Sequence, residues 1–469
     1  MSTSSSTSSP LAFSTLDLHP DLLSNLKTLD YHFLTDIQAQ SLPPILDGKD
    51  VIAQGKTGSG KTAAFGLGVL QKLDVKNFNV QALVLCPTRE LADQVANEIR
   101  RLARQLQNIK VLTLCGGMPM GPQISSLQQG AHIVVGTPGR IEDHLKKARL
   151  TLDQVKVLVL DEADRMLEMG FQPSLDTIIE QLPQQRQTLL FSATFPQQIE
   201  QISQRIMRQP IRVEVASKHD DSTITQHFYH VDSTEQRLQA LRLVLLQVKP
   251  ESGVVFCNTK KDVQMVADML RDAGFSALAL HGDLEQRDRD QTLIQFANKS
   301  ISILVATDVA ARGLDIEALD AVVNFHLAHD PEVHVHRIGR TGRAGSQGAA
   351  YSFISDKESY KVATLAEYLN QDIQAEPLPD ANLLNQPPLQ ARMVTLLIDG
   401  GKKNKLRPGD ILGALTANDV LNAGQVGKIK ITDKKSYVAV TRSVFKQALK
   451  QLGAGKLKGR TFRVHKLTR

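Results

Sequence analysis

The chain has 469 residues, which is long enough for three ordinary domains. Apolar residues make up 42% of it and charged residues 22%, the balance of a soluble globular protein. No apolar run approaches the roughly 20 residues that a membrane-spanning helix needs, which argues against a membrane protein.

The net charge of +6 is unevenly distributed along the chain. Residues 390–469 hold 18 Lys and Arg against 4 Asp and Glu, a net charge of +14, whereas the other 389 residues hold 37 against 45, a net charge of −8. Such basic density points to a polyanionic partner. A solvated basic tail is the alternative, but the segment also carries periodic apolar residues, and these favour a folded nucleic-acid-binding domain.

The N-terminus and the cysteines bear on where the protein works. Residues 1–12 are mostly Ser and Thr and lack the basic start and apolar core of a signal peptide, so we expect a disordered tail. Cys86, Cys115 and Cys257 each lie in or beside an apolar run, and the chain has no CxxC or Cys/His cluster. This pattern favours buried, reduced thiols in a cytoplasmic protein over a metal site.

Strand-like apolar runs alternate with helical stretches twice along the chain. The first series lies between Phe13 and Val215 and the second between Gln226 and Leu369, with a polar joint near 216–221. Alternation of this kind predicts two parallel sheets in tandem, each covered by helices. The predicted strands of the first series are 51–53, 82–85, 111–114, 133–135, 157–160 and 188–191, and those of the second are 253–256, 277–280, 301–305, 321–323 and 349–354.

A second joint is the linker of residues 376–390, which contains four prolines and is expected to be stiff and non-helical. Beyond it the order is strand, helix, strand, strand, helix, strand. This βαββαβ order suits a small α+β sandwich of the ferredoxin-like or RRM-like type. The predicted bounds are 393–398, 408–416, 426–432, 437–440, 443–452 and 461–464.

A complete P-loop pattern, Gly55-Lys-Thr-Gly-Ser-Gly-Lys-Thr62, follows the first strand and precedes a helix. Its glycines let backbone N–H groups close around phosphates, and the helix presents its positive end to them. Lys61 is expected to reach the β- and γ-phosphates, and Thr62 to ligate Mg²⁺. A glycine-rich turn without a ligand is the remote alternative. The predicted cradle comprises Gly55, Thr57, Gly58, Ser59, Gly60, Lys61 and Thr62.

Two carboxylates follow the strand Val157–Leu160, at the end where open α/β sheets place their ligands. Considered alone, they could be solvated side chains at a strand end. With a P-loop upstream, Asp161 is expected to anchor Mg²⁺, partly through water, and Glu162 is the candidate base that orients the attacking water.

The stretch Asp161-Glu-Ala-Asp164 resembles the signature of the DEAD-box RNA helicases, and the resemblance extends from Phe13 to about Ile354. Further ordered matches are Pro87–Ala92, Gly116–Gly117, Thr137–Arg140, Ser192–Thr194, Val254–Lys260, Ala306–Asp315 and His336–Arg343. The resemblance implies an ATP-dependent RNA helicase with two tandem RecA-like parallel-sheet domains followed by a small α+β RRM-like domain. The implied boundaries are 13–217, 218–375, the Pro-rich linker 376–390, and 391–469.

By the same resemblance, Gln38 would read the adenine edge and make the enzyme specific for ATP. Tyr31 would stack near the base with support from Phe13, and Asp315 would hold the ribose. The loop around the glutamine departs from the family pattern at three positions, where Gly, Pro and Pro are usual. These positions hold Asp30, Leu34 and Asp36.

The second domain lacks a P-loop and contributes Arg340 and Arg343, three residues apart in a Gly-rich loop. An arginine that reaches the γ-phosphate neutralises transition-state charge, an effect worth about 10³–10⁵ in rate. In the family, a further set of residues links the nucleotide site to domain closure. Its counterparts here are Asp164, Ser192, Thr194, Arg312 and His336.

Loops after strands and the first turns of helices offer backbone N–H groups, hydroxyls and guanidinium groups that suit phosphate contacts. Each such residue could be an ordinary surface turn, but their joint match to the family favours a sugar-phosphate path for RNA. The residues that the resemblance assigns to this path are Thr88, Arg89, Gly117, Thr137, Arg140, Thr259, Arg289 and Thr307.

The basic tail offers few aromatic residues for base stacking, because Tyr437 is the only one on its two central predicted strands. Its Lys and Arg gather in loops, so a structured RNA gripped by loops and edges fits better than a single strand on the sheet. The candidate contacts are Lys402, Lys403, Lys405, Arg407, Tyr437, Lys456, Lys458 and Arg460.

Within the DEAD-box family, the tail resembles that of the bacterial DbpA-type helicases in Val394–Lys403, Arg407–Ile411 and Gly427–Ile431. This resemblance implies recognition of a 23S ribosomal RNA hairpin near the peptidyl-transferase centre, on precursors of the large ribosomal subunit. No long heptad run argues for dimerisation, so a monomer is expected.

Two other functions are compatible with parts of this pattern. One is an ATP-gated RNA clamp or assembly scaffold with little unwinding, and the other is a DNA translocase. A clamp needs no turnover, so the joint presence of Glu162, Arg340 and Arg343 favours an enzyme, and the DEAD-box motif set argues against DNA.

Overall fold

The structure is a computed structural model, and it falls into two compact units that are described separately. The first unit is built from the residues up to 215 and the second from residue 224 onward. The described residues are 11–55, 58–215, 224–311, 319–342, 348–417 and 421–467.

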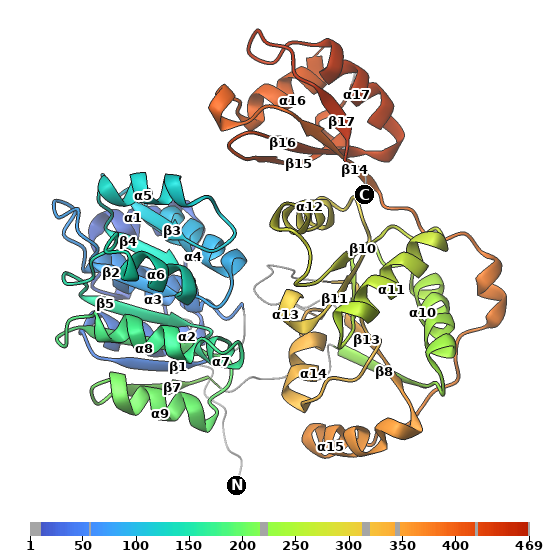
Figure 1. The fold of residues 1–469 in the computed structure, drawn as a ribbon, viewed down its shortest axis with the longest axis horizontal. Coiled ribbons are helices and arrows are strands. Elements are labelled where there is room, and N and C mark those ends of the chain that lie inside the picture. Colours follow the sequence, from blue (N-terminus) through green and yellow to red (C-terminus); the bar gives the residue numbers. More distant parts are fainter. Residues whose placement is uncertain are drawn as a thin grey trace. The chain divides into compact units, whose positions relative to one another are not determined.

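The first unit contains a seven-stranded parallel sheet in the order β3-β4-β2-β5-β6-β1-β7, with helices on both faces (Figure 1). The strands are β1 (Val51–Gln54), β2 (Ala82–Leu85), β3 (Val111–Leu114), β4 (Ile133–Gly136), β5 (Val157–Asp161), β6 (Gln187–Ser192) and β7 (Ile211–Glu214). Strand β7 was not predicted, because it lies at an edge of the sheet and only Val213 of its four residues is buried.

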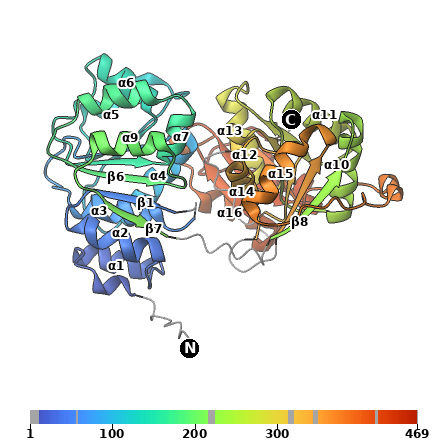
Figure 2. The same cartoon turned by 90° about the horizontal axis from the view of Figure 1, so that it is seen from below.

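Helices cover both faces of this sheet (Figure 2), and an apolar core on each face holds them to it. Helices α1 to α4 pack on one face around Phe65 and Phe191, whose ring centroids are 5.2 Å apart, and α6 to α9 pack on the other around Leu158 and Leu190. The helical bounds are η1 (Phe13–Thr15), α1 (Pro20–Thr28), α2 (Asp36–Leu46), α3 (Lys61–Gln71), α4 (Arg89–Leu102), α5 (Met120–Gln128), α6 (Pro138–Lys146), α7 (Ala163–Glu168), α8 (Gln172–Glu180) and α9 (Gln197–Ile206).

The second unit begins with a six-stranded parallel sheet in the order β10-β11-β9-β12-β13-β8. Its strands are β8 (Ile224–His230), β9 (Gly253–Phe256), β10 (Ala277–Leu280), β11 (Ile303–Ala306), β12 (Ala321–Asn324) and β13 (Gly348–Ile354). Its helices are α10 (Thr234–Val248), α11 (Lys260–Asp272), α12 (Gln286–Ala297), α13 (Asp308–Ala311), α14 (Pro331–Ile338), η3 (Asp356–Glu358) and α15 (Ser359–Leu369). Strand β8 was missed, because it is a polar edge strand that pairs only with β13 in the sheet.

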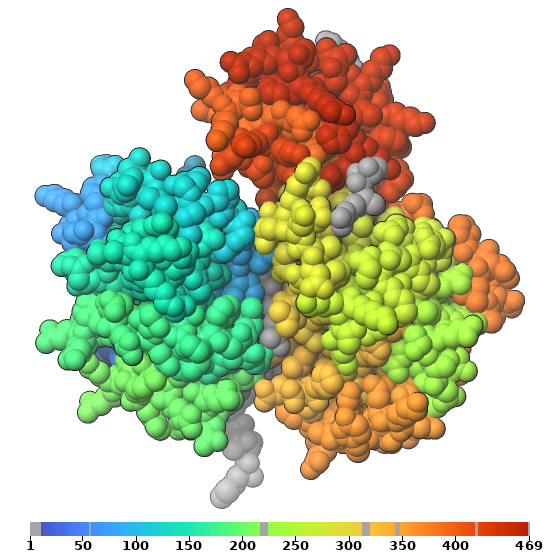
Figure 3. Space-filling view, viewed as in Figure 1, coloured from blue at the N-terminus to red at the C-terminus, as the bar shows by residue number. Residues whose placement is uncertain are grey.

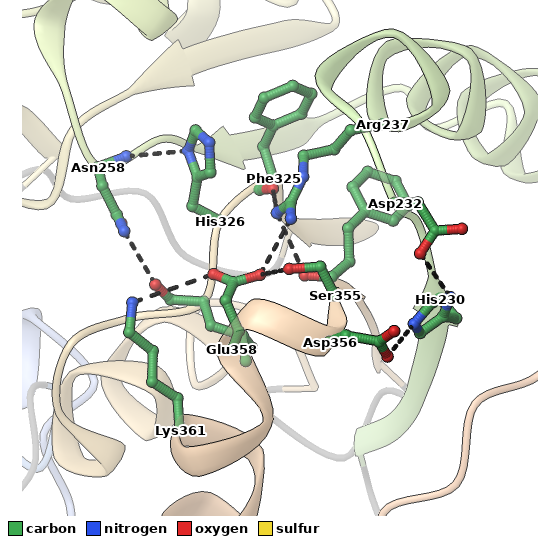
Figure 4. A network of polar contacts seen from close by, with 12 residues as sticks. His230, Asp232, Arg237, Asn258, Phe325, His326, Ser355, Asp356, Glu358 and Lys361 are labelled. Carbon is green, nitrogen blue, oxygen red and sulfur yellow. Dashed lines mark hydrogen bonds and ion pairs between the residues drawn. The ribbon is translucent and has the colours of Figure 1, made fainter.

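A polar network ties α10 to the strand ends of this sheet (Figure 4). The buried Arg237 donates hydrogen bonds to the carbonyl oxygens of Phe325 and Phe353, and its Nη2 donates to Glu358 Oε2 at 3.0 Å. Nearby, His230 Nε2 lies 2.9 Å from Asp356 Oδ1. The network therefore fixes η3 and the start of α15 against the sheet.

The Pro-rich linker is docked along the second unit, where it lies on the surface beside α10 (Figure 3). The Glu376 N–H donates to the Phe228 carbonyl oxygen at 2.7 Å, and the short 3₁₀-helix η4 (Ala381–Asn385) packs Leu383 and Leu384 on the core around α10. Gln390 Nε2 donates to the Gly274 carbonyl oxygen at 3.0 Å. The linker thus gains its stiffness from docking as well as from its prolines.

The C-terminal domain has the predicted βαββαβ order and a four-stranded antiparallel sheet, β15-β16-β14-β17. Its elements are β14 (Met393–Ile398), η5 (Lys402–Asn404), α16 (Pro408–Thr416), β15 (Val426–Ile431), β16 (Ser436–Thr441), α17 (Phe445–Ala454) and β17 (Val464–Lys466). The helices cover one face of the sheet and enclose an apolar core that includes Leu396, Val438 and Leu452. The fold prediction of two parallel-sheet domains and a small α+β domain is confirmed.

The other face of this sheet rests on α12. Leu397, Tyr437 and Leu467 form a small buried cluster with Ile294 of α12. The Thr395 hydroxyl accepts a hydrogen bond from Asn298 Nδ2 at 3.1 Å and lies 2.7 Å from the Ser300 hydroxyl. Tyr437 is only 5% exposed and, in this structure, offers no free face for stacking a base.

The three cysteines are free and buried, as predicted. Burial raises the pKa of the Cys86 thiol well above its ordinary value and raises the pKa of Cys115 to about 12. Among the described residues, no helix is long and apolar enough to cross a membrane.

Candidate active site and RNA interface

The predicted site residues of the first unit follow the carboxyl ends of its parallel strands. In a parallel sheet these ends share one edge, where α/β proteins bind their ligands. The predicted residues that follow or end β1 to β6 in this way are Gly55, Thr88, Gly117, Thr137, Asp161 and Ser192.

The phosphate cradle is held in shape by side chains from two elements. Lys61, at the first position of α3, donates from Nζ to the Gly55 carbonyl oxygen at 2.6 Å. Gly60 has φ +96°, and a Cβ there would lie 2.4 Å from Gln38 Nε2, so only glycine fits. The predicted Thr57 lies outside the described residues.

The glutamine predicted to read adenine contacts the cradle directly. Gln38 is 1% exposed, donates from Nε2 to the Gly60 carbonyl oxygen at 3.1 Å, and accepts from the Thr35 N–H at 3.0 Å. Thr35 in turn donates to the Ser59 carbonyl oxygen at 2.7 Å. The start of α2 and the end of the P-loop are therefore one hydrogen-bonded unit.

The two predicted aromatic residues lie together but differ in exposure. The Phe13 and Tyr31 rings meet edge to face with centroids 5.8 Å apart, and Phe13 is only 2% exposed. The Tyr31 hydroxyl donates to Glu98 Oε1 at 3.0 Å. Asp30, where the family usually has glycine, adopts a left-handed conformation with φ 59°. Phe13 can therefore support Tyr31 from inside the unit.

The two central carboxylates are in unusual environments. Asp161 is the last residue of β5, and burial raises its pKa to about 7, although the Lys61 charge opposes this. Glu162 caps α7 in a left-handed conformation, with φ 52°. Its Oε2 is buried without a hydrogen-bond partner, and Arg165 Nε lies 3.6 Å away. Strain and an unsatisfied oxygen are typical of residues that act on a ligand.

The acidic stretch is tied to the end of β6. Asp164 Oδ2 accepts hydrogen bonds from the Thr194 N–H at 3.0 Å and from the Thr194 hydroxyl at 2.9 Å, and the Asp164 N–H donates to the Ser192 hydroxyl. Burial alone would raise the pKa of Asp164, but the Arg165 charge and the Thr194 hydrogen bonds outweigh it and hold the pKa below its usual range. The structure thus brings together the three predicted coupling residues of this unit.

Two of the predicted RNA-contact loops of the first unit are joined to each other. The Thr137 N–H donates to the Leu114 carbonyl oxygen at 3.1 Å, and Arg140 Nη1 donates to the Met118 carbonyl oxygen at 3.1 Å. Gly117 lies between them in a left-handed conformation. Thr88 caps α4 by accepting from the Leu91 N–H, and Arg89 is the first residue of that helix.

In the second unit, the predicted contact residues also stand at strand ends. Thr259 caps α11 after β9, and Thr307 follows β11 and accepts from the Ala310 N–H. Arg289 of α12 donates to the Ala310 carbonyl oxygen at 2.9 Å. Of the predicted catalytic and coupling residues, His336 lies on α14 and Arg340 just after it. Arg312, Asp315 and Arg343 lie outside the described residues.

Arg337 is a functional candidate to which the sequence reasoning gave no role. Its guanidinium is 2% exposed and pairs with both carboxylate oxygens of Asp308, at 2.6 and 2.7 Å. It also donates to Asn258 Oδ1 at 3.0 Å and to Asn324 Oδ1 at 3.2 Å. It therefore fixes the ends of β9, β11 and β12, next to Thr259 and Thr307. Its position within the family motif His336–Arg343 is the sequence feature that could have indicated a role for it.

Nine of the basic residues of the C-terminal domain lie in three loops that are bonded to one another. The Lys402 and Lys403 N–H groups donate to the carbonyl oxygens of Thr432 and Asp433, and Lys458 Nζ donates to the Lys405 carbonyl oxygen at 2.8 Å. We call this surface the basic rim. Its residues are Lys402, Lys403, Lys405, Arg407, Lys434, Lys435, Lys456, Lys458 and Arg460.

Comparison with known proteins identifies the family. The DEAD/DEAH box helicase model matches residues 35–202, the helicase conserved C-terminal domain matches 235–345, and the DbpA RNA binding domain matches 395–466. The chain belongs to the DEAD-box ATP-dependent RNA helicases. It is therefore an enzyme of the class that hydrolyses ATP and binds RNA.

Individual relatives cover almost the whole helicase. The ATP-dependent RNA helicase DbpA of Escherichia coli (strain K12) is 55% identical over 97% of this chain and 99% of its own length. The protein of the same name from Bacillus subtilis (strain 168) is 37% identical over the same shares. Among solved structures, S. cerevisiae Dbp5 bound to RNA and ADP BeF3 gives a TM-score of 0.71 at 30% identity, covering 78% of this chain and 95% of that chain.

The burial of Asp161 predicts a pH-dependent stability. Because folding raises the pKa of this carboxyl group, the protonated acid stabilises the fold fully below about pH 4, and that stabilisation is lost as the pH rises through about 7. Without nucleotide or metal, Asp161→Asn should therefore be more stable than the wild type at pH 8, by about 1.4 kcal/mol per pKa unit of the shift, but not at pH 4. Urea unfolding at the two pH values measures this. Equal stability at pH 8 would contradict it.

The contacts of Arg337 predict that lysine cannot replace it without a loss of stability and of ATPase activity. Arg337→Lys should lower the free energy of unfolding by roughly 3 kcal/mol, because a buried paired group is left unsatisfied, and should abolish most RNA-stimulated ATP hydrolysis. Arg271→Lys is the matched control, since Arg271 pairs with Asp268 at 2.7 Å on an exposed helix face. Urea unfolding and steady-state ATPase assays test both variants, and similar behaviour of the two would refute the role assigned to Arg337.

Proposed function

We propose that this helicase couples ATP hydrolysis to local, non-processive unwinding of RNA, and that its C-terminal domain directs it to a 23S rRNA hairpin near the peptidyl-transferase centre during assembly of the large ribosomal subunit. The observation that carries the proposal is the division of the catalytic groups between the units. Lys61, Asp161 and Glu162 belong to the first unit, whereas Arg340 belongs to the second. We assign the first unit to 13–217 and the second RecA-like domain to 218–375.

The site residues of the first unit fit ATP with Mg²⁺. A glycine cradle, a buried lysine, a fully buried carboxyl group and an unsatisfied carboxylate oxygen are the groups that such a ligand requires. Thr62 and Asp161 would hold the metal, partly through water, and bound Mg²⁺ would neutralise phosphate charge. Glu162 would orient the attacking water and take its proton, and Arg340 would stabilise charge on the γ-phosphate.

Hydrolysis is expected to depend on closure of the two domains, because neither holds all the catalytic groups. If ATP and RNA each favour the closed arrangement, linkage makes their binding cooperative. Closure would distort the RNA locally. Stacking in a DNA duplex is worth about 1.4 kcal/mol per step, and if RNA is similar, one closure can open only a short duplex. Phosphate release would then reopen the domains.

Targeting is assigned to the basic rim of the C-terminal domain, residues 391–469. The part of the sheet face around Tyr437 is covered by α12, so the loops and the edge strand β15, with its exposed Lys428 and Lys430, are left to hold RNA. A hairpin gripped through its phosphates fits this arrangement. We further propose that the enzyme works as a monomer in the cytoplasm on large-subunit precursors.

Glu162→Gln tests the catalytic assignment. The amide keeps the size of the side chain but cannot accept a proton, so ATP-dependent RNA binding should persist while turnover falls by at least two orders of magnitude. RNA-binding assays with a non-hydrolysable ATP analogue and steady-state ATPase assays measure the two effects. Normal turnover would remove the role of Glu162, and normal RNA binding with negligible wild-type unwinding would favour a clamp or scaffold.

The basic rim is tested by charge reversal. Changing the exposed Lys402 and Lys403 together to Glu should remove the preference for the 23S hairpin over unrelated RNA and leave general RNA-stimulated ATPase activity. The salt dependence of binding should also lose about 0.7 in slope per lost phosphate contact. The matched control changes the exposed Lys446 and Lys450 of α17 to Glu. An equal loss in both double variants would show only a general charge effect.

A further inference from the structure

A buried polar pair, Gln123 and His144, connects the two proposed RNA-contact loops of the first unit on their buried side. Gln123 of α5 is 6% exposed, and His144 of α6 is fully buried. Gln123 Nε2 donates to the Cys115 carbonyl oxygen at 3.1 Å, and His144 Nε2 lies 3.1 Å from Gln123 Oε1. Neither residue belongs to a motif to which the sequence assigned a role.

The hydrogen-bond directions in this pair are fixed by chemistry. The Cys115 carbonyl oxygen can only accept, so the Gln123 amide must present its NH₂ group there and its oxygen to the imidazole. His144 must therefore carry its proton on Nε2. Burial and the nearby Arg140 charge both lower the pKa of His144, which keeps the ring neutral. The pair accordingly has one stable arrangement.

The pair acts on the loop that contains Gly116 and Gly117. Cys115 is the first residue after β3, and the other end of the loop is fixed where Arg140 donates to the Met118 carbonyl oxygen at 3.1 Å. Gly116 has open space around the position of a Cβ, so packing of its own does not hold it. The loop is therefore held at Met118 by Arg140 and at Cys115 by Gln123, which His144 supports in turn.

We propose that Gln123 and His144 are positioning residues for RNA, which hold the Gly116–Gly117 backbone in register with Thr137 and Arg140 so that one sugar-phosphate strand can contact both loops. The inference rests on the proposed function, because it requires these loops to contact RNA. A displacement of about 1 Å at such a position is enough to lose much of an oriented interaction.

Three variants of the full-length protein test this role. Gln123→Met keeps the volume and removes both hydrogen bonds, His144→Leu removes the donor, and His144→Gln restores an amide donor to the same acceptor. Gln128→Met, on an exposed position of α5, is the matched control. The readouts are the Kd for a fluorescent unstructured single-stranded RNA with a non-hydrolysable ATP analogue, the Kd for a fluorescent ADP, and the melting temperature.

We expect Gln123→Met and His144→Leu each to weaken RNA binding about five- to tenfold, in line with the loss of a buried hydrogen bond, with ADP binding unchanged. The double variant should be no weaker than either single variant, because both break the same connection. His144→Gln and Gln128→Met should bind RNA as the wild type does. RNA affinity within twofold of wild type in folded Gln123→Met would overturn the inference, as would an equal loss of RNA and ADP binding.

Arg140→Ala separates this inference from the proposed function. If Arg140→Ala weakens RNA binding while Gln123→Met and His144→Leu do not, the loops contact RNA but the buried pair does not position them, and the inference fails alone. If Arg140→Ala also binds RNA normally, the RNA path assigned to these loops is itself wrong.

Discussion

The burial of the carboxyl end of β5 is the constraint on which the candidate active site depends. Four apolar residues of β5 lie in the middle of a seven-stranded sheet, and they carry Asp161 into the interior, where burial raises its pKa to about 7. A charge in such a place interacts strongly with any neighbouring charge, because little solvent screens it. The next residue, Glu162, adopts a left-handed conformation, so the chain leaves the strand and begins α7 directly after Asp161. The neighbouring Asp161 and Glu162 therefore lie in different environments, one at the end of β5 and the other at the start of α7.

The second unit also has a buried charged group at the ends of its strands, but this group is the guanidinium of Arg337 and not a carboxyl group. Arg337 occupies the strand-end position there, and its five donors satisfy acceptors from three strand ends. A guanidinium can do this because its donors form a rigid planar fork. In the first unit, the buried Asp164 ties the start of α7 to Thr194 after β6. In the second unit, Arg337 ties together the ends of β9, β11 and β12.

Most of the fold followed from local pattern, and the omissions have a common cause. Buried parallel strands are nearly continuous apolar runs, so β1 to β6 and β9 to β13 were predictable, as was the βαββαβ order of the tail. Strands β7 and β8 are edge strands in which polar side chains interrupt the apolar ones, so they lack the continuous apolar run that marks the inner strands. The P-loop and the acidic stretch were predictable because their chemistry needs a fixed local spacing.

Residues that act across elements could not be found in this way. The partners of Gln123 and Arg337 come from strand ends and helices distant in sequence, and no spacing rule connects them. Tyr437 shows the opposite case. Its residue type suggested base stacking, but α12 covers it, and burial raises the pKa of its hydroxyl group. Whether an aromatic residue on a sheet meets a ligand or a neighbouring helix is decided by tertiary packing.

The docked linker has a consequence for protein engineering. A proline-rich joint between a catalytic core and a basic tail invites the exchange of one RNA-binding module for another at that point. Here the joint supplies Leu383 and Leu384 to the core of the second unit, and the tail covers Ile294 with its own apolar residues. A chimaera cut within 376–390 would uncover both surfaces and would be prone to aggregate. A graft that keeps the linker and the α12-facing residues of β14 and β16, and changes only the basic rim, would alter the proposed RNA-contact surface without opening the core.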